Sequence, residues 1–262
     1  MDTTQLFSLK DRTALVTGGS RGIGRMIAEG FIAQGARVYI SSRKADACER
    51  TAAELSAGGG ACISLPMDVS TVDGARALAA AYAAREPKLD ILVNNAGAAW
   101  LAAFDDFSEQ GWDKVMDLNV KSPFFVTQAL AGSLRAAARK ERPAKVINIA
   151  SIDGIYLTPR ETYSYAASKS ALIQLTRIMA ARLVKDHIVV SAIAPGPFAS
   201  DMNVYARDHE AKTAASVPLQ RIGTDLDMAG AAIFLASRAG DYVVGSVVTV
   251  DGGIAFASSP AR

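Results

Sequence analysis

Cysteine and histidine are both scarce in this chain of 262 residues. The two cysteines, Cys48 and Cys62, form no Cys-x-x-Cys pair and have no metal-ligand spacing, which argues against a disulfide framework and suits a reducing compartment. The two histidines, His187 and His209, are far apart in the sequence, so a zinc site or a histidine-based catalytic triad has little support. We therefore expect a protein that works without a metal ion.

Excess charge and long apolar runs are also missing. The chain has 28 Lys and Arg residues against 26 Asp and Glu residues, and a net charge of +2 without a basic block argues against a nucleic-acid partner. No apolar stretch reaches membrane-spanning length, and Met1 to Lys10 do not combine a positive start with an apolar run. We expect a cytoplasmic protein without membrane contact, in which 50% hydrophobic residues provide a sizeable core.

Segments typical of strands and helices alternate from end to end, without a repeat or a Pro/Ser-rich linker. This alternation predicts an α/β fold in a single domain over 1–262, with one doubly wound parallel sheet of about seven strands flanked by helices. Ligands of such sheets bind outside the carboxyl ends of the strands. The expected strands cover 12–17, 36–41, 61–65, 89–93, 146–150, 187–194 and 246–250, and the expected helices include 25–34, 45–57, one or two over 108–139, and 225–236.

A glycine-rich turn follows the first expected strand and leads into a helix. Its spacing, Gly18-x-x-x-Gly22-x-Gly24, differs from the Gly-x-Gly-x-x-Gly of the commonest dinucleotide fingerprint. Such a turn still lets a pyrophosphate approach free backbone N–H groups at the helix N-terminus. An ordinary turn is the alternative, but the strand before and the helix and strand after favour a phosphate site.

The end of the second expected strand indicates which dinucleotide would bind. An acidic residue there would bind the ribose hydroxyls of NAD, whereas this strand ends in Ser41-Ser42-Arg43-Lys44. Arg43 can hold a 2′-phosphate bidentately, and Arg21 from the glycine turn can add to the pocket. The sequence therefore favours NADP over NAD, with a solvated loop charge as the alternative for Arg43.

The third and fourth expected strands run into polar or small residues. Asp68-Val69 follow the third strand, where Asp68 can either meet the adenine edge or cap the helix that starts near Thr71. The fourth strand leads into Asn94-Asn95-Ala96-Gly97, whose small residues and amides suit a cofactor crevice, although a plain turn also contains Asn and Gly. Both segments are expected at the same carboxyl edge of the sheet.

Tyr165 and Lys169 lie four residues apart among good helix formers, so they share one face of a helix. The ammonium would lower the pKa of the phenol and let Tyr165 exchange a proton with a substrate hydroxyl or carbonyl near neutral pH. Alone, this spacing is more typical of a solvated helix face. Two further polar candidates are Ser151, at the end of the fifth strand, and Asn119, four residues before the helix-kinking Pro123.

In their order along the chain, these motifs resemble the short-chain dehydrogenase/reductase family over nearly the whole sequence. Within the family the similarity is greatest to NADPH-dependent 3-ketoacyl reductases, including those associated with rhamnolipid synthesis. The resemblance implies a Rossmann-like oxidoreductase that forms a homotetramer through its long helices and its C-terminal strand. The matching residues are Thr17-Gly18-x-x-x-Gly22-x-Gly24, Asn94-Asn95-Ala96-Gly97, Asn119, Ser151, Tyr165-x-x-x-Lys169 and Pro195-Gly196.

The resemblance also implies a role for each candidate. Tyr165 would be the general acid in ketone reduction, and Lys169 would bind the nicotinamide ribose and keep the pKa of the tyrosine low. Ser151 would bind the carbonyl oxygen, and Asn119 would hold a water that links Lys169 to solvent. The residues expected to bind NADPH or NADP+ are Gly18, Ser20, Arg21, Gly22, Ile23, Gly24, Ser42, Arg43, Asp68, Val69, Asn95, Ala96, Gly97, Tyr165, Lys169, Pro195, Gly196, Phe198 and Ser200.

The substrate is the least determined feature. We expect a 3-oxoacyl thioester, with another ketone, a sugar acid or a catalytically silent NADP-binding regulator as alternatives. The pocket should be lined by the chain after Gly97, by 152–162 and by a substrate lid at 198–221. The serine-to-tyrosine interval is longer than in many members and contains Asp153 and Glu161. Four apolar residues favour an acyl pocket or else pack the lid onto the domain: Trp100, Phe198, Met202 and Tyr205.

Overall fold

The computed structural model describes residues 3, 5–158, 160–200 and 203–257. Within these residues the strands are β1 (Thr13–Thr17), β2 (Arg37–Ser41), β3 (Ala61–Ser64), β4 (Ile91–Asn94), β5 (Ala144–Ile149), β6 (Ile188–Pro195) and β7 (Val247–Val250). They form one sheet in the order β3-β2-β1-β4-β5-β6-β7, and all neighbouring strands pair in parallel. The predicted doubly wound parallel sheet is confirmed. The chain changes direction across the sheet between β1 and β4, the switch point at which such sheets bind ligands.

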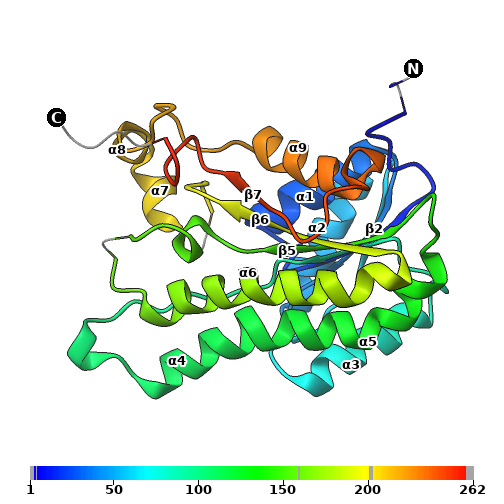
Figure 1. Cartoon of the computed structure of the whole chain (residues 1–262), viewed down its shortest axis with the longest axis horizontal. Coiled ribbons are helices and arrows are strands. Elements are labelled where there is room, and N and C mark those ends of the chain that lie inside the picture. The colour runs from blue at the N-terminus through cyan, green and yellow to red at the C-terminus, as the bar shows by residue number, and fades with distance from the viewer. Residues whose placement is uncertain (1–2, 4, 159, 201–202, 258–262) are drawn as a thin grey trace.

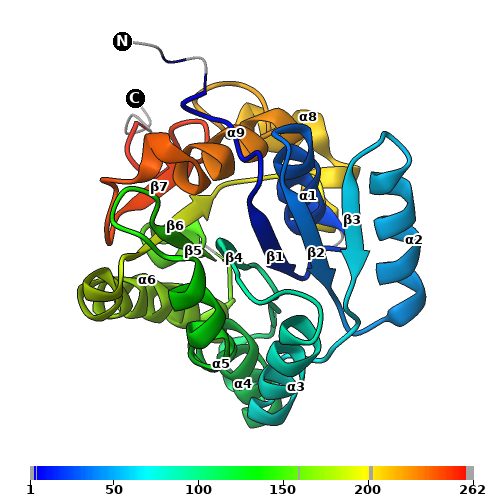
Figure 2. The ribbon, with the colours of Figure 1, turned by 90° about the vertical axis from the view of Figure 1, so that its right-hand side faces the viewer.

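Helices cover both faces of this sheet (Figure 1 and Figure 2). The helices of one face are α1 (Gly22–Ala33), α2 (Ala45–Ser56) and α9 (Asp225–Ala236), and those of the other are α3 (Val72–Ala83), α5 (Ser122–Ala137) and α6 (Tyr163–Leu183). The shorter helical segments are η1 (Phe104–Asp106), α4 (Glu109–Met116), η2 (Asp117–Lys121), η3 (Ile152–Gly154), η4 (Val184–Asp186), α7 (Val204–Asp208), α8 (Glu210–Ala215) and η5 (Arg238–Gly240). No helix in the described part of the chain combines the length and apolarity needed to cross a membrane.

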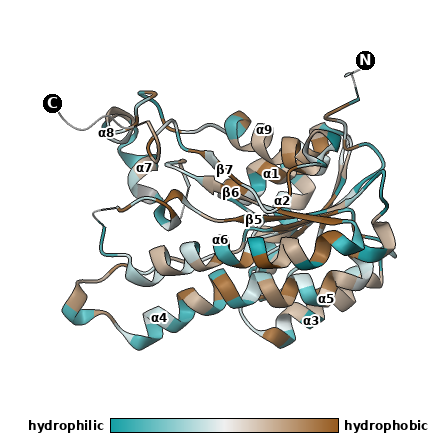
Figure 3. Ribbon diagram, in the orientation of Figure 1, coloured by the Kyte–Doolittle hydropathy of each residue, from teal (hydrophilic) through white to brown (hydrophobic). Residues whose placement is uncertain are grey.

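The central strands are buried because helices shield both of their faces, and Figure 3 shows hydrophobic residues concentrated along them. All residues of β5 are buried. Apolar side chains fill the space on each side of the sheet, with Phe31 from α1 on one side and Leu78 from α3 and Leu130 from α5 on the other. Full burial of one such side chain contributes about 1.5–3 kcal/mol, so these clusters stabilise the sheet whose edge carries the polar site.

The long helical segment predicted over 108–139 is interrupted by a π-turn. Helix α4 passes into η2, a stretch of π-helix, and then into α5 without leaving the helical path. Pro123 lies at the start of α5 and has no N–H to donate to the carbonyl of Asn119 four residues earlier. The predicted local disturbance near Asn119 therefore takes the form of a π-turn, a feature often found at functional sites.

Asp68 does not cap the helix that follows it. Thr71 is the N-cap of α3, and its Oγ1 accepts a hydrogen bond from the N–H of Gly74 at 3.0 Å. Asp68 instead accepts a hydrogen bond from the N–H of Ser70 at 3.0 Å. The capping alternative for Asp68 is therefore wrong, because Thr71, three residues later, accepts the hydrogen bond from the free N–H of Gly74.

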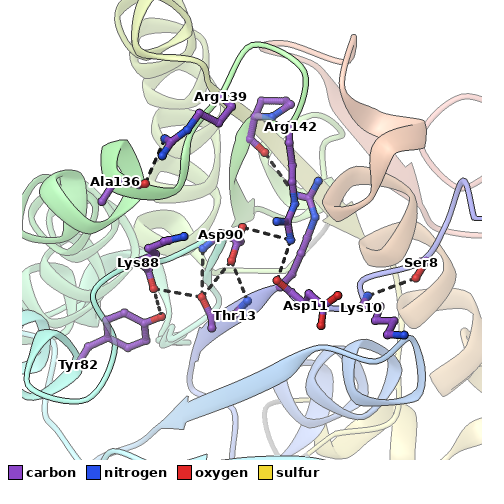
Figure 4. Close-up of polar contacts among 12 residues, drawn as sticks. Ser8, Lys10, Asp11, Thr13, Tyr82, Lys88, Asp90, Ala136, Arg139 and Arg142 are labelled. Carbon is purple, nitrogen blue, oxygen red and sulfur yellow. Dashed lines mark hydrogen bonds and ion pairs between the residues drawn. The ribbon is translucent and has the colours of Figure 1, made fainter.

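A charged cluster closes the amino end of the sheet, opposite the carboxyl ends of the strands (Figure 4). The N–H of Thr13 donates to Asp90 at 2.9 Å, and the guanidinium of Arg142 lies 3.7 Å from the same carboxylate. Lys145, which is 1% exposed, forms an ion pair of 2.7 Å with Asp241 beyond η5. Each of these charges has a partner, so the cluster is built to hold strands β1, β4 and β5 together.

Candidate functional site

The carboxyl ends of β1, β2, β4, β5 and β6 open into one cavity of about 880 Å³. Its volume is typical of sites that hold a cofactor or a small ligand. Of the predicted site residues, Gly24 and Asn119 do not line it. Those that do are Gly18, Ser20, Arg21, Gly22, Ile23, Ser42, Arg43, Asp68, Val69, Asn95, Ala96, Gly97, Ser151, Tyr165, Lys169, Pro195, Gly196, Phe198 and Ser200.

The glycine turn has the backbone geometry that its composition predicts. Gly18 and Gly22 have φ angles of 65° and 51°, which other residues adopt only with strain. Gly24 lies beneath the turn, where a Cβ would collide with the carbonyl oxygen of Gly18 and the side-chain nitrogen of Asn95. The amide of Asn95 donates to the carbonyl oxygens of Thr17 and Gly18 at 3.0 and 3.1 Å and thereby fixes the turn. Helix α1 begins at Gly22, so its first N–H groups are directed to this end of the cavity.

Cationic side chains gather at the end of the cavity next to β2. Arg21 and Arg43 line it as predicted, together with Lys44 and Arg50. Arg50 was missed because it lies within α2 rather than at a strand end. The signal in the sequence is that α2 is the helix that directly follows Arg43 and Lys44. A phosphate at this end would meet several cations.

The opposite end of the cavity contains Ser151, Tyr165 and Lys169. Ser151 follows β5, and the other two lie one helical turn apart on α6. The Lys169 ammonium is buried, donates to the carbonyl oxygen of Ile149 at 2.8 Å and lies 5.5 Å from the centre of the Tyr165 ring. The predicted convergence of these residues is therefore present in the structure.

The protonation behaviour of the pair differs from the prediction. Removal from bulk water raises the pKa of Tyr165 to about 12, although a hydrogen bond with Ser151 acts in the opposite direction. Burial lowers the pKa of Lys169 to about 8, against the attraction of the Asp153 carboxylate. The prediction of a lowered tyrosine pKa is wrong for this structure, because desolvation outweighs the lowering effects of Ser151 and Arg160. Tyr165 is therefore a protonated phenol near neutral pH, the form that can donate a proton.

Asn119 lies behind the cavity in the π-turn η2 and is 1% exposed. Its Oδ1 accepts from the N–H of Ala98 at 2.8 Å, and its Nδ2 donates to the carbonyl oxygen of Ala98 at 2.9 Å and to Ser168 Oγ at 3.0 Å. The side-chain amide thus ties the loop after β4 to helix α6. A water held by Asn119 stays a prediction.

The sequence did not predict a pair of buried amides, Asn94 and Asn148, that lies between the sheet and two helices. Asn94 Nδ2 donates to Asn148 Oδ1 at 2.9 Å and to Thr127 Oγ1 at 3.0 Å, and Asn148 Nδ2 donates to Thr176 Oγ1 at 2.9 Å. All four side chains are buried. They connect β4 and β5 to α5 and α6, so Asn94 acts in the packing of the sheet rather than in the crevice itself.

Of the four apolar residues that suggested an acyl pocket, Trp100 and Tyr205 do not line the cavity, whereas Phe198 does. Trp100 packs against Gly111, with the Lys114 ammonium 5.3 Å from its ring centre, and the Tyr205 ring meets the His209 ring edge-on, with 4.8 Å between their centres. Phe198 is buried with its ring against Gly223, and Met202 lies outside the described residues. This part of the cavity also contains Ile152 and Ile254, together with several polar residues: Asp153, Tyr156, Thr158, Arg160, Thr162, Asn203, Thr213 and Ser216.

Comparison with known proteins gives consistent matches. A family model described as Enoyl-(Acyl carrier protein) reductase matches residues 18–255. The rhamnolipids biosynthesis 3-oxoacyl-[acyl-carrier-protein] reductase of Pseudomonas aeruginosa is 50% identical over 250 residues, which cover 94% of this chain and 97% of that protein. The 2-dehydro-3-deoxy-D-gluconate 5-dehydrogenase of Dickeya dadantii is 38% identical, with 94% and 96% covered. The solved RhlG/NADP active-site complex of Pseudomonas aeruginosa superimposes with a TM-score of 0.93 at 48% identity and covers 96% of this chain and 99% of its own.

Proposed function

The chain belongs to the short-chain dehydrogenase/reductase family of oxidoreductases, and from this premise we propose that it uses NADPH to reduce a ketone to a secondary alcohol. One observation carries the proposal: Ser151, Tyr165 and Lys169 line the same cavity as the glycine turn and Arg43. That cavity offers free helix N–H groups and cations for the phosphates of a dinucleotide. A solved relative that is similar along nearly its whole length is an NADP complex.

The proposed reaction divides the work among three side chains. The bound nicotinamide supplies the hydride for the carbonyl carbon. Tyr165 donates its phenolic proton to the carbonyl oxygen, which becomes the hydroxyl of the product. Ser151 donates a hydrogen bond to the same oxygen and stabilises the negative charge that develops there. Lys169 carries a positive charge beside the phenolate that Tyr165 leaves and binds the ribose hydroxyls of the cofactor.

The remaining predicted residues hold the cofactor in this proposal. Arg43, with Arg21, would bind the 2′-phosphate, and this contact would favour NADPH over NADH. Asp68 and Val69 face the adenine. The backbone at Pro195 and Gly196 and the hydroxyl of Ser200 bind the nicotinamide amide, and segment 198–221 closes over the substrate as a lid.

The best-supported substrate is a 3-oxoacyl thioester, because the 50% identical relative is named for that activity. A sugar acid is the second candidate. It is favoured by the polar side chains at the substrate end, including Asp153 and Arg160, and by the similarity to a gluconate-type dehydrogenase. Both candidates need the same proton and hydride transfer, so they differ only in what the substrate end of the cavity recognises.

One experiment tests both steps of the proposal. NADPH oxidation is followed with acetoacetyl and longer 3-oxoacyl thioesters, with cyclic ketones and with keto-sugar acids, while NADPH binding is measured separately by nicotinamide fluorescence. We expect turnover that is fastest with the thioesters. Fastest turnover with keto-sugar acids would replace the substrate assignment. Binding of NADPH without turnover of any ketone would instead point to a regulator that senses the cofactor.

The proposed assembly is a homotetramer. Exposed apolar side chains on the helices of one face and near the C-terminus support it, with Phe124 on α5, Ile178 on α6 and Tyr242 after η5 being 38%, 59% and 100% exposed. Apolar surface of this kind is typical of an interface. Light scattering coupled to gel filtration should give the mass of four chains; the mass of one chain would refute the assembly.

A further inference from the structure

Asp153 is a carboxylate in the catalytic end of the cavity that the reaction described above does not use. It lies two residues after Ser151 on the short turn η3 and lines the cavity together with Tyr165 and Lys169. The side chain is half-buried. Its negative charge acts on both neighbours. It adds to the raised pKa of Tyr165 and opposes the lowering of the pKa of Lys169 by burial. The carboxylate is therefore close to the atoms that would carry out the reaction.

The backbone of η3 is fixed against the catalytic helix. The N–H of Asp153 donates to Ser151 Oγ at 3.1 Å, and the carbonyl oxygen of Gly154 accepts from Ser170 Oγ at 2.9 Å. A Cβ at Gly154 would lie only 2.6 Å from the carbonyl carbon of Lys169, so η3 and α6 are in tight contact. This packing gives Asp153 a defined position relative to Tyr165 and Lys169.

The Asp153 carboxylate has no hydrogen bond or ion pair with any residue that the structure describes. Its charged neighbours are Arg160 from the following loop and Lys169 from α6, and both act on it only at longer range. A half-buried carboxylate without a partner costs free energy, and burial accordingly raises the pKa of Asp153. By contrast, the other acidic side chain of this loop, Glu161, accepts a hydrogen bond from the hydroxyl of Tyr163 at 3.1 Å.

We propose that Asp153 is a specificity-determining residue that accepts a hydrogen bond from a substrate hydroxyl or amide N–H near the carbonyl to be reduced. This inference rests on the proposed ketone reduction and narrows its substrate class. A carboxylate accepts hydrogen bonds but donates none when ionised, so the matching substrate group is a donor. The same charge repels a substrate carboxylate at this position, so an acidic group on the substrate would have to lie elsewhere.

Two pairs of ketones test the proposal, and each pair differs in one donor. For the hydroxyl, 2-hydroxycyclohexanone is compared with 2-methoxycyclohexanone, in which a methyl group caps the oxygen; for the amide N–H, the acetoacetyl thioester of N-acetylcysteamine is compared with its 2-acetoxyethyl analogue, in which an ester oxygen replaces the N–H. In at least one pair we expect kcat/KM of the wild-type enzyme to be about 10- to 100-fold higher for the member with the donor, because a site built to bind a donor discriminates strongly against its absence. The pair that shows the preference identifies the donor.

Three variants separate recognition from a structural role. Asp153→Leu should reduce the preference to within about threefold, whereas Asp153→Asn, which keeps an acceptor oxygen, should retain most of it. Glu161→Gln is the matched control and should leave the ratio unchanged. A purely structural role would lower kcat/KM for both members of a pair equally and leave the ratio intact. Nicotinamide fluorescence with NADPH reports whether each variant has folded.

The outcomes distinguish this proposal from the function on which it rests. Turnover by the wild-type enzyme with equal kcat/KM in both pairs would overturn the role of Asp153 alone. An unchanged preference in Asp153→Leu would do the same. If the wild-type enzyme binds NADPH but reduces none of the four ketones, the proposed reduction of ketones fails and the role of Asp153 fails with it.

Discussion

The two ends of the parallel sheet use charged residues in different ways. At the amino end, Asp90 accepts a hydrogen bond from Thr13 and is paired with Arg142 (Figure 4). The buried Lys145 is paired with Asp241 at the same end. At the carboxyl end, Asp153 is half-buried and has no hydrogen-bond or ion-pair partner among the described residues. Both ends carry charged residues. The presence of charge therefore does not separate a structural cluster from a site that receives a ligand. What separates them is whether the protein itself supplies a partner for the charge.

The largest effect should come from Tyr165→Phe at the carboxyl end. Loss of the proton donor should lower kcat for ketone reduction by about 100- to 10,000-fold. NADPH binding should change little, because the glycine turn and Arg43 are untouched. Steady-state kinetics and fluorescence binding measure the two effects. Tyr163→Phe is the control, since that tyrosine is exposed and its hydroxyl forms a hydrogen bond only with Glu161 among the described residues. If Tyr165→Phe keeps a turnover within threefold of wild type, Tyr165 is not the proton donor.

Arg43→Ala should have the next largest effect and should be selective. A charge-assisted hydrogen bond to a phosphate contributes about 1.5–3 kcal/mol, so KM for NADPH should rise about 10- to 100-fold. KM for NADH, which has no 2′-phosphate, should hardly change. Arg76→Ala is the control, because Arg76 is paired with the exposed Asp73 at 3.2 Å and neither residue lines the cavity. Equal increases for both cofactors would show that Arg43 does not bind the 2′-phosphate.

The sequence predicts the fold well because its signals are local. Short apolar runs ending in Gly18, Ser42 or Asn94 mark buried parallel strands, and the carboxyl ends of such strands must meet at one edge. Gly18 and Ser42 therefore line the cavity, whereas Asn94 is used in the packing of the sheet. Backbone topology alone brings the carboxyl ends of the strands together, so this prediction does not depend on side-chain packing.

What the sequence does not predict depends on contacts between distant segments. The raised pKa of Tyr165 comes from burial, which pairwise spacing on a helix does not reveal. Trp100 was expected near the substrate but packs onto Gly111, and the side chain of Asn119 is occupied by Ala98 and Ser168. Arg50 reaches the cavity from within a helix rather than from a strand end. Each of these outcomes is decided by packing in three dimensions.

At the amino end, Asp241→Ala should lower stability and leave catalysis intact. It removes the partner of the Lys145 ammonium, which is 1% exposed, so a buried charge is left uncompensated. Breaking such a pair costs about 3–5 kcal/mol in full burial, and we expect about 2 kcal/mol here because Asp241 is 27% exposed. Urea unfolding measures the loss. Asp73→Ala, which breaks an exposed pair with Arg76, should destabilise much less, and a fall in kcat for Asp241→Ala would couple the two ends of the sheet.

The smallest effect should be a dependence of activity on pH, caused by Lys169 at the carboxyl end of the sheet. Lys169 has a pKa of about 8, below its ordinary value, so its cationic form is present at neutral pH and is lost as the pH rises through about 8. Tyr165, with a pKa of about 12, stays protonated over this range and cannot cause the change. If the proposed reduction needs the cation beside the developing phenolate, kcat should fall about tenfold between pH 7 and pH 9. Rates with saturating NADPH measure the fall, and a flat profile would show that the charge of Lys169 is not needed.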